Sequence, residues 1–408
     1  MNIVKIALAG GTALTLTMTM AMADGNEAYL TQDGEGNSAL IQQAAGPGGN
    51  RVGTALNPIL QDGDNNSFRE TQATGGGFSR GDNVIDAASQ LGNNNSFSSN
   101  YSNNAGSNLI EDVLQNGDRN VISIGRNNSI GGTVGTVLQE GDKNILTITQ
   151  QSGTGNTVAK VQMIGNINGF GTVNANNVGT RIIQSGNNNL IEESTVIGSN
   201  NNPTAGNGPW NVNVHSIRQY GNDNGLISSR AVTMGSDGNA IAVLQTGNGN
   251  NFDLKQGIDV TSTRNRITLT QTGNGNALDG VQYGSRNTIT AEKTGDFNMA
   301  QMEQYGDDNT ASLTILGDFN GRNIAFTGNA SLLGLASGDI MQDGAFNIAS
   351  LNIVGDSNGF AFDQTGDSNS ITGSISGNMN QVAVLQVGNS NVASFSQSGN
   401  GNNAAISQ

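Results

Sequence analysis

The chain has 408 residues, 59 of them glycine, with no cysteine, one histidine and a formal net charge of −15. The acidic balance excludes the basic surface that a nucleic-acid partner needs, and the lack of cysteine excludes disulfides and cysteine catalysis. Abundant Gly, Asn, Ser, Gln and Thr are atypical of a globular core. The 35% hydrophobic content is nevertheless too high for plain disorder.

The first 23 residues have the features of an export signal. Lys5 gives a short positive region, the run from Ile6 to Met20 is apolar or small, and Ala21-Met22-Ala23 matches a small-residue cleavage site. A membrane anchor is the alternative, but the run is short and rich in Thr and Gly. We therefore predict residues 1–23 to be a signal peptide cleaved after Ala23, and a mature chain without an integral membrane segment.

From there on, the string Gln-x-Gly-x-x-Asn recurs along the chain. Relaxed copies replace the glutamine, as at Lys293, Ile315, Ile353 and Ile375. The glutamines of the full copies are Gln32, Gln61, Gln90, Gln115, Gln139, Gln151, Gln184, Gln219, Gln245, Gln271, Gln282, Gln304, Gln342, Gln364, Gln386 and Gln397.

The residues between one Asn and the next Gln alternate in polarity. In "NTASLTI", Ala311, Leu313 and Ile315 share one parity, and the threonines and serine share the other. This period of two predicts a half-buried β-strand. The Gln-to-Asn segment, with Gly third and often Asp fourth, is typical of a tight turn. Each eleven-residue unit is thus one strand and one bend.

Two such units make a strand-turn-strand arch of 22 residues, which buries little apolar surface alone. Arches stacked in parallel at about 4.8 Å would pair every main-chain amide. The sequence therefore predicts an all-β fold, a β-solenoid with cross-β stacking over residues 24–408. Equivalent Gln and Asn side chains would then form amide ladders along the stack. The predicted ladder residues are Gln271, Asn276, Gln282, Asn287, Gln304, Asn309, Gln342, Asn347, Gln364, Asn369, Gln386, Asn391, Gln397 and Asn402.

The repeat is interrupted in several places, which we interpret as loops that leave the stack. One of them holds Pro203, Pro209, Trp210 and His215, including the only Trp and the only His. The alternative interpretation is that this segment contacts a partner molecule. The predicted loops lie near residues 44–58, 73–82, 167–181, 198–216 and 321–341.

Catalytic chemistry has little support in this sequence. A single histidine without cysteine does not provide a Cys-His dyad or the usual zinc ligands. The acidic pairs Glu192-Glu193 and Glu111-Asp112 are adjacent in sequence, so in a strand they point to opposite faces. Turn chemistry accounts for the recurrent Gly-Asp-x-Asn without calcium. We expect no enzyme activity, no catalytic residues, no cofactor and no metal site.

The repeats resemble those of the curlin family. "QDGEGNSALIQQ" at Gln32 and "QVGNSNVASFSQ" at Gln386 are similar to the curlin pattern Ser-x5-Gln-x-Gly-x-x-Asn-x-Ala-x3-Gln. The resemblance implies an exported chain that assembles at the bacterial surface into curli, the amyloid fibres of the biofilm matrix, used in adhesion and aggregation. It also implies curli-type export and nucleation proteins as partners.

The leading hypothesis is a secreted, self-assembling fibre subunit, located extracellularly in a cell-surface fibre. The repeats fit a bulk subunit and a nucleator equally. The rival hypothesis is a monomeric secreted β-solenoid that acts as an adhesin or surface-binding module. Such a solenoid is expected to carry polar capping segments, which we do not find near the last strand or in the short stretch from Asp24 to Thr31.

Overall fold

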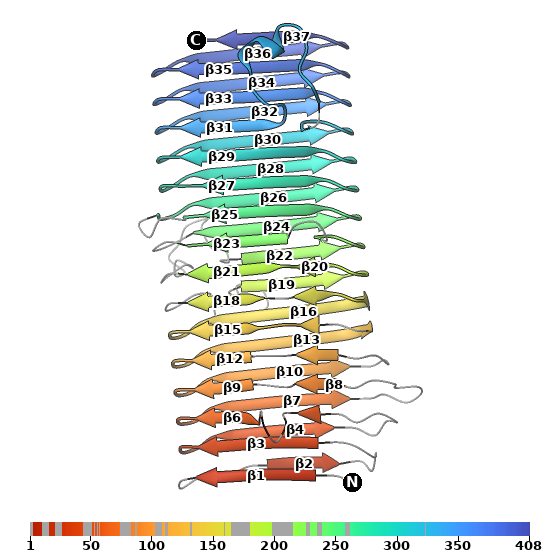
Figure 1. Ribbon diagram of the computed structural model, residues 1–408, viewed down its shortest axis with the longest axis vertical. Helices are drawn as coiled ribbons and strands as arrows, with labels where there is room; N and C mark the ends of the chain where they lie inside the picture. The colour runs from red at the N-terminus through yellow and green to blue at the C-terminus, as the bar shows by residue number, and fades with distance from the viewer. Residues whose placement is uncertain are drawn as a thin grey trace, which may run out of the picture. The chain divides into compact units, whose positions relative to one another are not determined.

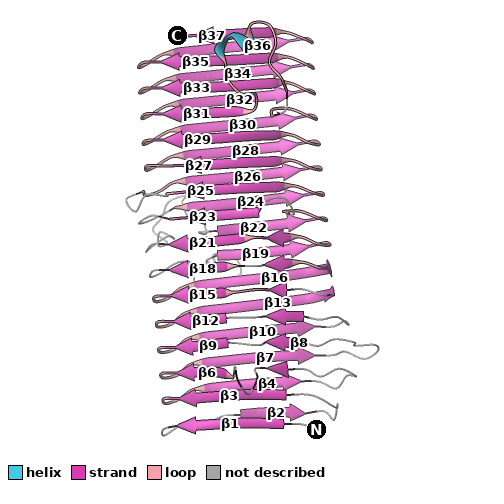
Figure 2. Cartoon of the chain, in the orientation of Figure 1, coloured by secondary structure: helices cyan, strands magenta, loops and turns pink. Residues whose placement is uncertain are grey.

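The structure is a computed structural model of the chain. It describes residues 3–9, 16–20, 27–43, 51–52, 54, 56, 58–73, 83–85, 88–102, 108–110, 113–130, 133–158, 160–164, 180–197, 215–225, 229–234, 239–257, 262–322 and 324–408. This part of the chain is all-β apart from the 3-10 helix η1 (Ala330–Leu333), as Figure 2 shows. Within the same residues, no helix has the length and apolar character to cross a membrane.

The chain forms two compact units, Met1–Asn222 and Asp223–Gln408. In each unit, parallel strands stack one above another in two sheets, A and B, and the chain passes from one sheet to the other at every turn (Figure 1). One passage through both sheets is a rung. The all-β solenoid predicted from the sequence is confirmed.

In the first unit, the rungs are irregular because most strands of sheet A are split in two. Glutamines on neighbouring rungs are 29, 25 and 24 residues apart. Sheet A holds β1 (Ile3–Ala9), β3 (Glu27–Asp33), β5 (Arg51–Val52), β6 (Ile59–Asp62), β8 (Asn83–Ile85), β9 (Ala88–Leu91), β11 (Asn108–Ile110), β12 (Val113–Asn116), β14 (Thr133–Val134), β15 (Val137–Glu140), β17 (Thr157–Val158), β18 (Val161–Ile164), β20 (Leu190–Ile191) and β21 (Glu193–Ile197). Sheet B holds β2 (Leu16–Met20), β4 (Ser38–Gln43), β7 (Ser67–Ala73), β10 (Ser96–Ser102), β13 (Val121–Ile130), β16 (Ile145–Thr154), β19 (Thr180–Ser185) and β22 (His215–Tyr220).

In the second unit, the rungs are regular and mostly 22 residues long, as predicted. Sheet A holds β23 (Ser229–Thr233), β25 (Asn251–Gln256), β27 (Ala277–Gln282), β29 (Met299–Tyr305), β31 (Asp339–Asp343), β33 (Gly359–Thr365), β35 (Gln381–Val387) and β37 (Asn403–Ser407). Sheet B holds β24 (Ala240–Thr246), β26 (Arg266–Thr272), β28 (Thr288–Thr294), β30 (Thr310–Leu316), β32 (Ile348–Val354), β34 (Ser370–Ser376) and β36 (Val392–Ser398).

The core of each rung is the thin layer between the two sheets. In β30, Ala311, Leu313 and Ile315 are buried, whereas the residues between them face outward. The same parity holds in β33, where Phe360 and Phe362 are buried to 1% exposure or less. Each such aromatic or aliphatic side chain contributes roughly 1.5–3 kcal/mol by leaving water. The period of two in the sequence is therefore the inward–outward alternation of these strands.

Several predicted loops are shorter than expected, because pairing with the next rung draws their end residues into strands. Strand residues inside the predicted loops are Arg51 and Val52, Ala73, Thr180 and Arg181, His215 and Ser216, and Asp339 to Met341. Most other residues of the first four loops, Trp210 among them, lie outside the described residues.

The predicted signal peptide contains β1 and β2, which pair in parallel with β3 and β4. Its cleavage after Ala23 stays a prediction, and residues 10–15 and 21–26 lie outside the described part of the chain.

Candidate functional site

The predicted glutamines of sheet A form a continuous amide ladder inside the second unit. Gln364 Nε2 donates to Gln386 Oε1 at 3.0 Å and also to the main-chain oxygen of Ile348, at 3.1 Å in sheet B. All these glutamines are buried except at the last rung. The ladder runs from Gln256 through Gln282, Gln304, Gln342, Gln364 and Gln386 to Gln408. Each amide from Gln282 to Gln386 thus joins two rungs and both sheets.

The equivalent column of sheet B is mixed. It begins with Gln245, whose Nε2 donates to Gln271 at 2.9 Å. The following rungs place Lys293, Ile315, Ile353, Ile375 and Gln397 in register above Gln271. Gln397 donates to the main-chain oxygen of Gln381 rather than to a side chain. The structure therefore does not join Gln271 and Gln397, although both belong to the predicted set.

The predicted asparagines bridge rungs mainly through the main chain. Asn287 Oδ1 accepts the N–H of Asn309 at 2.9 Å, and Asn287 Nδ2 donates to the carbonyl oxygen of Gly306 at 2.7 Å. Asn309, Asn347 and Asn369 repeat this pair of bonds to the rung that follows. Asn276 does the same at the other turn of the rung. Asn391 Nδ2 instead bonds within its own turn, to Val387, whereas Asn402 Nδ2 donates both to Ser398 in its own turn and to Asn380 Oδ1 on the preceding rung.

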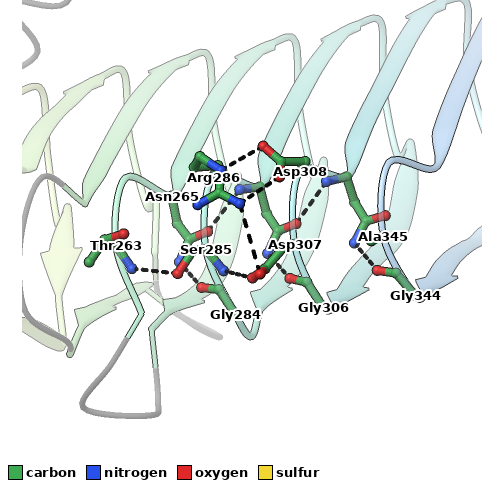
Figure 3. Close-up of polar contacts among 12 residues, drawn as sticks. Thr263, Asn265, Gly284, Ser285, Arg286, Gly306, Asp307, Asp308, Gly344 and Ala345 are labelled. Carbon is green, nitrogen blue, oxygen red and sulfur yellow. Dashed lines mark hydrogen bonds and ion pairs between the residues drawn. The ribbon is translucent and has the colours of Figure 1, made fainter. Parts of the chain in front are cut away.

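The turn aspartates have a role that the sequence did not reveal. Asp307 Oδ1 accepts the N–H of Ser285 at 2.7 Å, one rung away, and Asp318 Oδ1 accepts the N–H of Asp296 at 2.7 Å (Figure 3 shows the first). The sequence indicates only a turn-forming role for these residues. Only the rung spacing brings the partners together, since they lie 22 residues apart.

The third position of the motif requires glycine. Gly366 has φ of +111°, and a Cβ placed on it would lie 2.2 Å from the carbonyl oxygen of Gly388 on the next rung. That oxygen is the acceptor for Asn369 Nδ2 at 2.7 Å. The tight approach of glycine to glycine is therefore what lets the asparagine reach across.

An exposed ion pair adds to one turn. Arg286 extends to the next rung, where its Nη2 lies 2.6 Å from Asp308 Oδ2 and 3.9 Å from Asp307 Oδ2 (Figure 3). The bond from Arg286 lowers the pKa of the Asp308 carboxyl. Both side chains are solvated, so this pair contributes little to stability.

Two buried titratable groups stand out. Lys293 is fully buried and donates from Nζ to the main-chain oxygen of Ala277, and burial lowers its pKa to about 7. In the first unit, His215 is fully buried with its Nδ1 2.8 Å from Ser194 Oγ, and burial lowers its pKa to about 3. His215 belongs to the core, although the sequence placed it in a loop.

In the first unit, one glutamine of the repeated motif does not lie in the column. Gln150, not Gln151, takes the column position and donates from Nε2 to Gln184 Oε1 at 3.1 Å. The motif at Gln151 is one residue out of register with the strand. Among the residues the structure describes, no group of three or more His, Cys, Asp or Glu side chains is arranged to hold a metal ion.

This geometry defines a class of protein, a parallel two-sheet β-solenoid whose rungs are joined by buried side-chain amides. Residues 377–408 match the family model described as curlin associated repeat, so this segment carries a curlin repeat. The matched residues contain β35, β36 and β37 with their turns. The resemblance inferred from the sequence is confirmed there. Comparison with curated proteins found no match to the chain.

Proposed function

We propose that the protein is a secreted structural subunit that assembles with itself into extracellular curli-like amyloid fibres, which serve the biofilm matrix, adhesion and cell aggregation. In this proposal it is not an enzyme, and it uses curli-type export and nucleation proteins. It does not bind nucleic acid.

The observation that carries the proposal is the self-complementarity of a rung. The upper side of a rung offers Asn369 Oδ1 and Nδ2, and the lower side of the next offers the Asn391 N–H and the Gly388 carbonyl oxygen that bind them. The same relation recurs between Asn287 and the rung of Asn309. A rung of a second copy can therefore continue the stack with the same bonds and no new chemistry.

The test is growth of freshly desalted mature chain, starting at Asp24, followed by thioflavin T fluorescence without shaking. A lag that preformed fibres shorten supports the proposal. The ladder variant Asn369→Ala should grow more slowly, because it removes both inter-rung bonds. Thr372→Ala, an exposed outward position on the next strand, is the matched control.

A surface-binding module is the alternative, and one observation favours it. Phe297 and Phe319, at successive turns, are exposed and stacked with ring centroids 5.2 Å apart. Exposed apolar rows of this kind often mark binding surfaces. A flat fluorescence trace from a folded, monodisperse chain would contradict fibre assembly and make these phenylalanines the first residues to test for a ligand.

A further inference from the structure

One rung of the second unit contains a long insertion. Gln304 and Gln342 are adjacent in the ladder but 38 residues apart in the chain, against 22 for the next pair. The insertion leaves sheet A after Gly321 and returns at Gly338, and both of its ends are tied into the sheet by main-chain bonds. We call residues 324–338 the strap. Figure 1 shows it running along the stack from β31 past β33 and β35 to β37.

Arg322 anchors the base of the strap on one outward-facing column of sheet A. This column contains Asp279, Gln301 and Asp339 on successive rungs. Arg322 Nη1 lies 3.0 Å from Asp279 Oδ2, its Nε lies 3.3 Å from Asp339 Oδ1, and its Nη2 donates to Gln301. A polar column of this kind keeps the outer face of a sheet hydrated.

Beyond Asp339 the same column changes character, and there the strap covers it. The next residues in register are Ala361 and Ala383, which face outward yet are 1% and 0% exposed. A Cβ placed on neighbouring Gly359 would lie 2.9 Å from the Phe326 ring and 3.2 Å from Ile324. The strap therefore lies on a patch of small outward-facing residues in β33 and β35 that Gln381 borders.

Polar contacts hold the far end of the strap. Gln381 Oε1 accepts the Thr327 N–H at 2.7 Å, and Asn403 Oδ1 accepts the Ala330 N–H at 2.7 Å. The short helix η1 packs on β35 and β37. The Thr327 bond is exposed and the Ala330 bond is part-buried, unlike the buried glutamine ladder, so these bonds hold the strap less firmly than the ladder holds the rungs.

We propose that the strap is a removable cover over a lateral docking face, and that the occupant of this face, once uncovered, is the same face of a second copy. Flat β-sheet faces with small side chains pack against each other as dry interfaces, and Gly359, Ala361 and Ala383 make such a face over adjacent rungs. With the strap in place, copies join only along the stack. With the strap displaced, they also join side by side.

The experiment removes the strap while keeping the register. Deleting residues 322–337 with Gly338→Ala joins Gly321 to position 338, so the spacing from Gln304 to Gln342 returns to that of the other rungs. Sedimentation velocity of the full mature chain, freshly desalted, should show an apparent association constant at least tenfold above the parent. Adding Ala361→Lys and Ala383→Lys to the deletion should return the protein to the parent's behaviour.

A folded deletion variant that sediments like the parent would overturn the proposal, as would association that the two lysines leave unchanged. If the deletion variant does not fold, the double variant Gln381→Ala, Asn403→Ala tests whether the strap covers the docking face. This variant should loosen the strap, and the rate of chymotrypsin cleavage near Phe326 measures that loosening. Association that rises with cleavage supports the cover, and cleavage without association contradicts it. Fibre elongation is read separately, by thioflavin T, so failure of the proposed function would leave this result intact.

Discussion

The ammonium group of Lys293 donates a hydrogen bond to the main-chain oxygen of Ala277 in the fully buried interior of the second unit. Lys293 occupies a column position that holds glutamine one rung earlier, at Gln271, and isoleucine one rung later, at Ile315. A charge in this position has no counterpart on the neighbouring rungs of sheet B. Its main opposing charge is Asp279, and Arg322 acts against it.

Stability should therefore rise with pH through the alkaline range. The pKa of Lys293 falls from 10.5 to about 7 on folding, chiefly through burial. Between these values the unfolded chain holds a proton that the folded chain does not, so folding is penalised as pH falls from 10.5 to 7. Lys293→Gln should remove this slope and stabilise the chain at pH 7 by on the order of 3–5 kcal/mol. Denaturant unfolding of variant and parent at pH 7, 9 and 10.5 measures it, and parallel pH profiles would contradict the prediction.

His215 predicts an acid-sensitive range for the first unit. Burial lowers its pKa from 6.5 to about 3. The unfolded chain binds a proton between these values and the folded chain does not, so stability is complete above pH 6.5 and declines as pH falls toward 3. His215→Gln should flatten this decline by up to about 1.4 kcal/mol per pH unit. Unfolding of variant and parent at pH 7, 5 and 4 compares the slopes, with Lys293→Gln as a control that should not alter them.

Asn369→Ala should destabilise the monomeric chain as well as slow its assembly. The substitution leaves the Asn391 N–H and the Gly388 carbonyl oxygen without their side-chain partner. Both bonds are part-buried, so their loss should cost about 0.5–1.5 kcal/mol each. Urea unfolding measures the loss, and Thr372→Ala, which faces outward, should stay close to the parent. Equal effects of the two substitutions would contradict the role of the amide ladder.

Gly366 and Gly388 form a matched pair for testing the turn. Their φ values are +111° and +108°, so alanine is strained equally at both. A Cβ on Gly366 would lie 2.2 Å from a carbonyl oxygen, whereas the nearest atom to a Cβ on Gly388 is 3.7 Å away. Gly366→Ala should therefore lower the melting temperature of the isolated chain clearly more than Gly388→Ala.

The same pair also separates stability from growth. In the proposed fibre, the rung of another copy would bring its glycine carbonyl against residue 388. Gly388→Ala should then destabilise the isolated chain less than Gly366→Ala, yet slow thioflavin T kinetics severely. Normal growth of Gly388→Ala would argue against a stack continued at this turn.

The alternation of polarity and the spacing of Gln, Gly and Asn were enough to predict the strands, the turns and the sheet A glutamines from Gln282 to Gln386, but not Gln256 or Gln408, which do not begin a complete motif. They did not reveal the partners of Asp307 or Asp318, because those bonds join turns on different rungs. They also missed His215, since the prolines upstream suggested a loop. The inward parity of His215, Ile217 and Gln219 was the available signal. The strap contains no copy of the repeat, so the sequence does not predict its path.

The two columns of the second unit differ in one respect that bears on recognition. Along sheet A each rung from Gln256 to Gln408 offers glutamine. Along sheet B the order is glutamine, lysine, three isoleucines and glutamine, from Gln271 to Gln397. A rung that slips by one position would still satisfy sheet A but would change the neighbours in sheet B: Gln271, which lies against Lys293 in the native register, would lie against Ile315. The uniform column of sheet A thus allows any two rungs to stack, whereas the varied column of sheet B favours one register over the others.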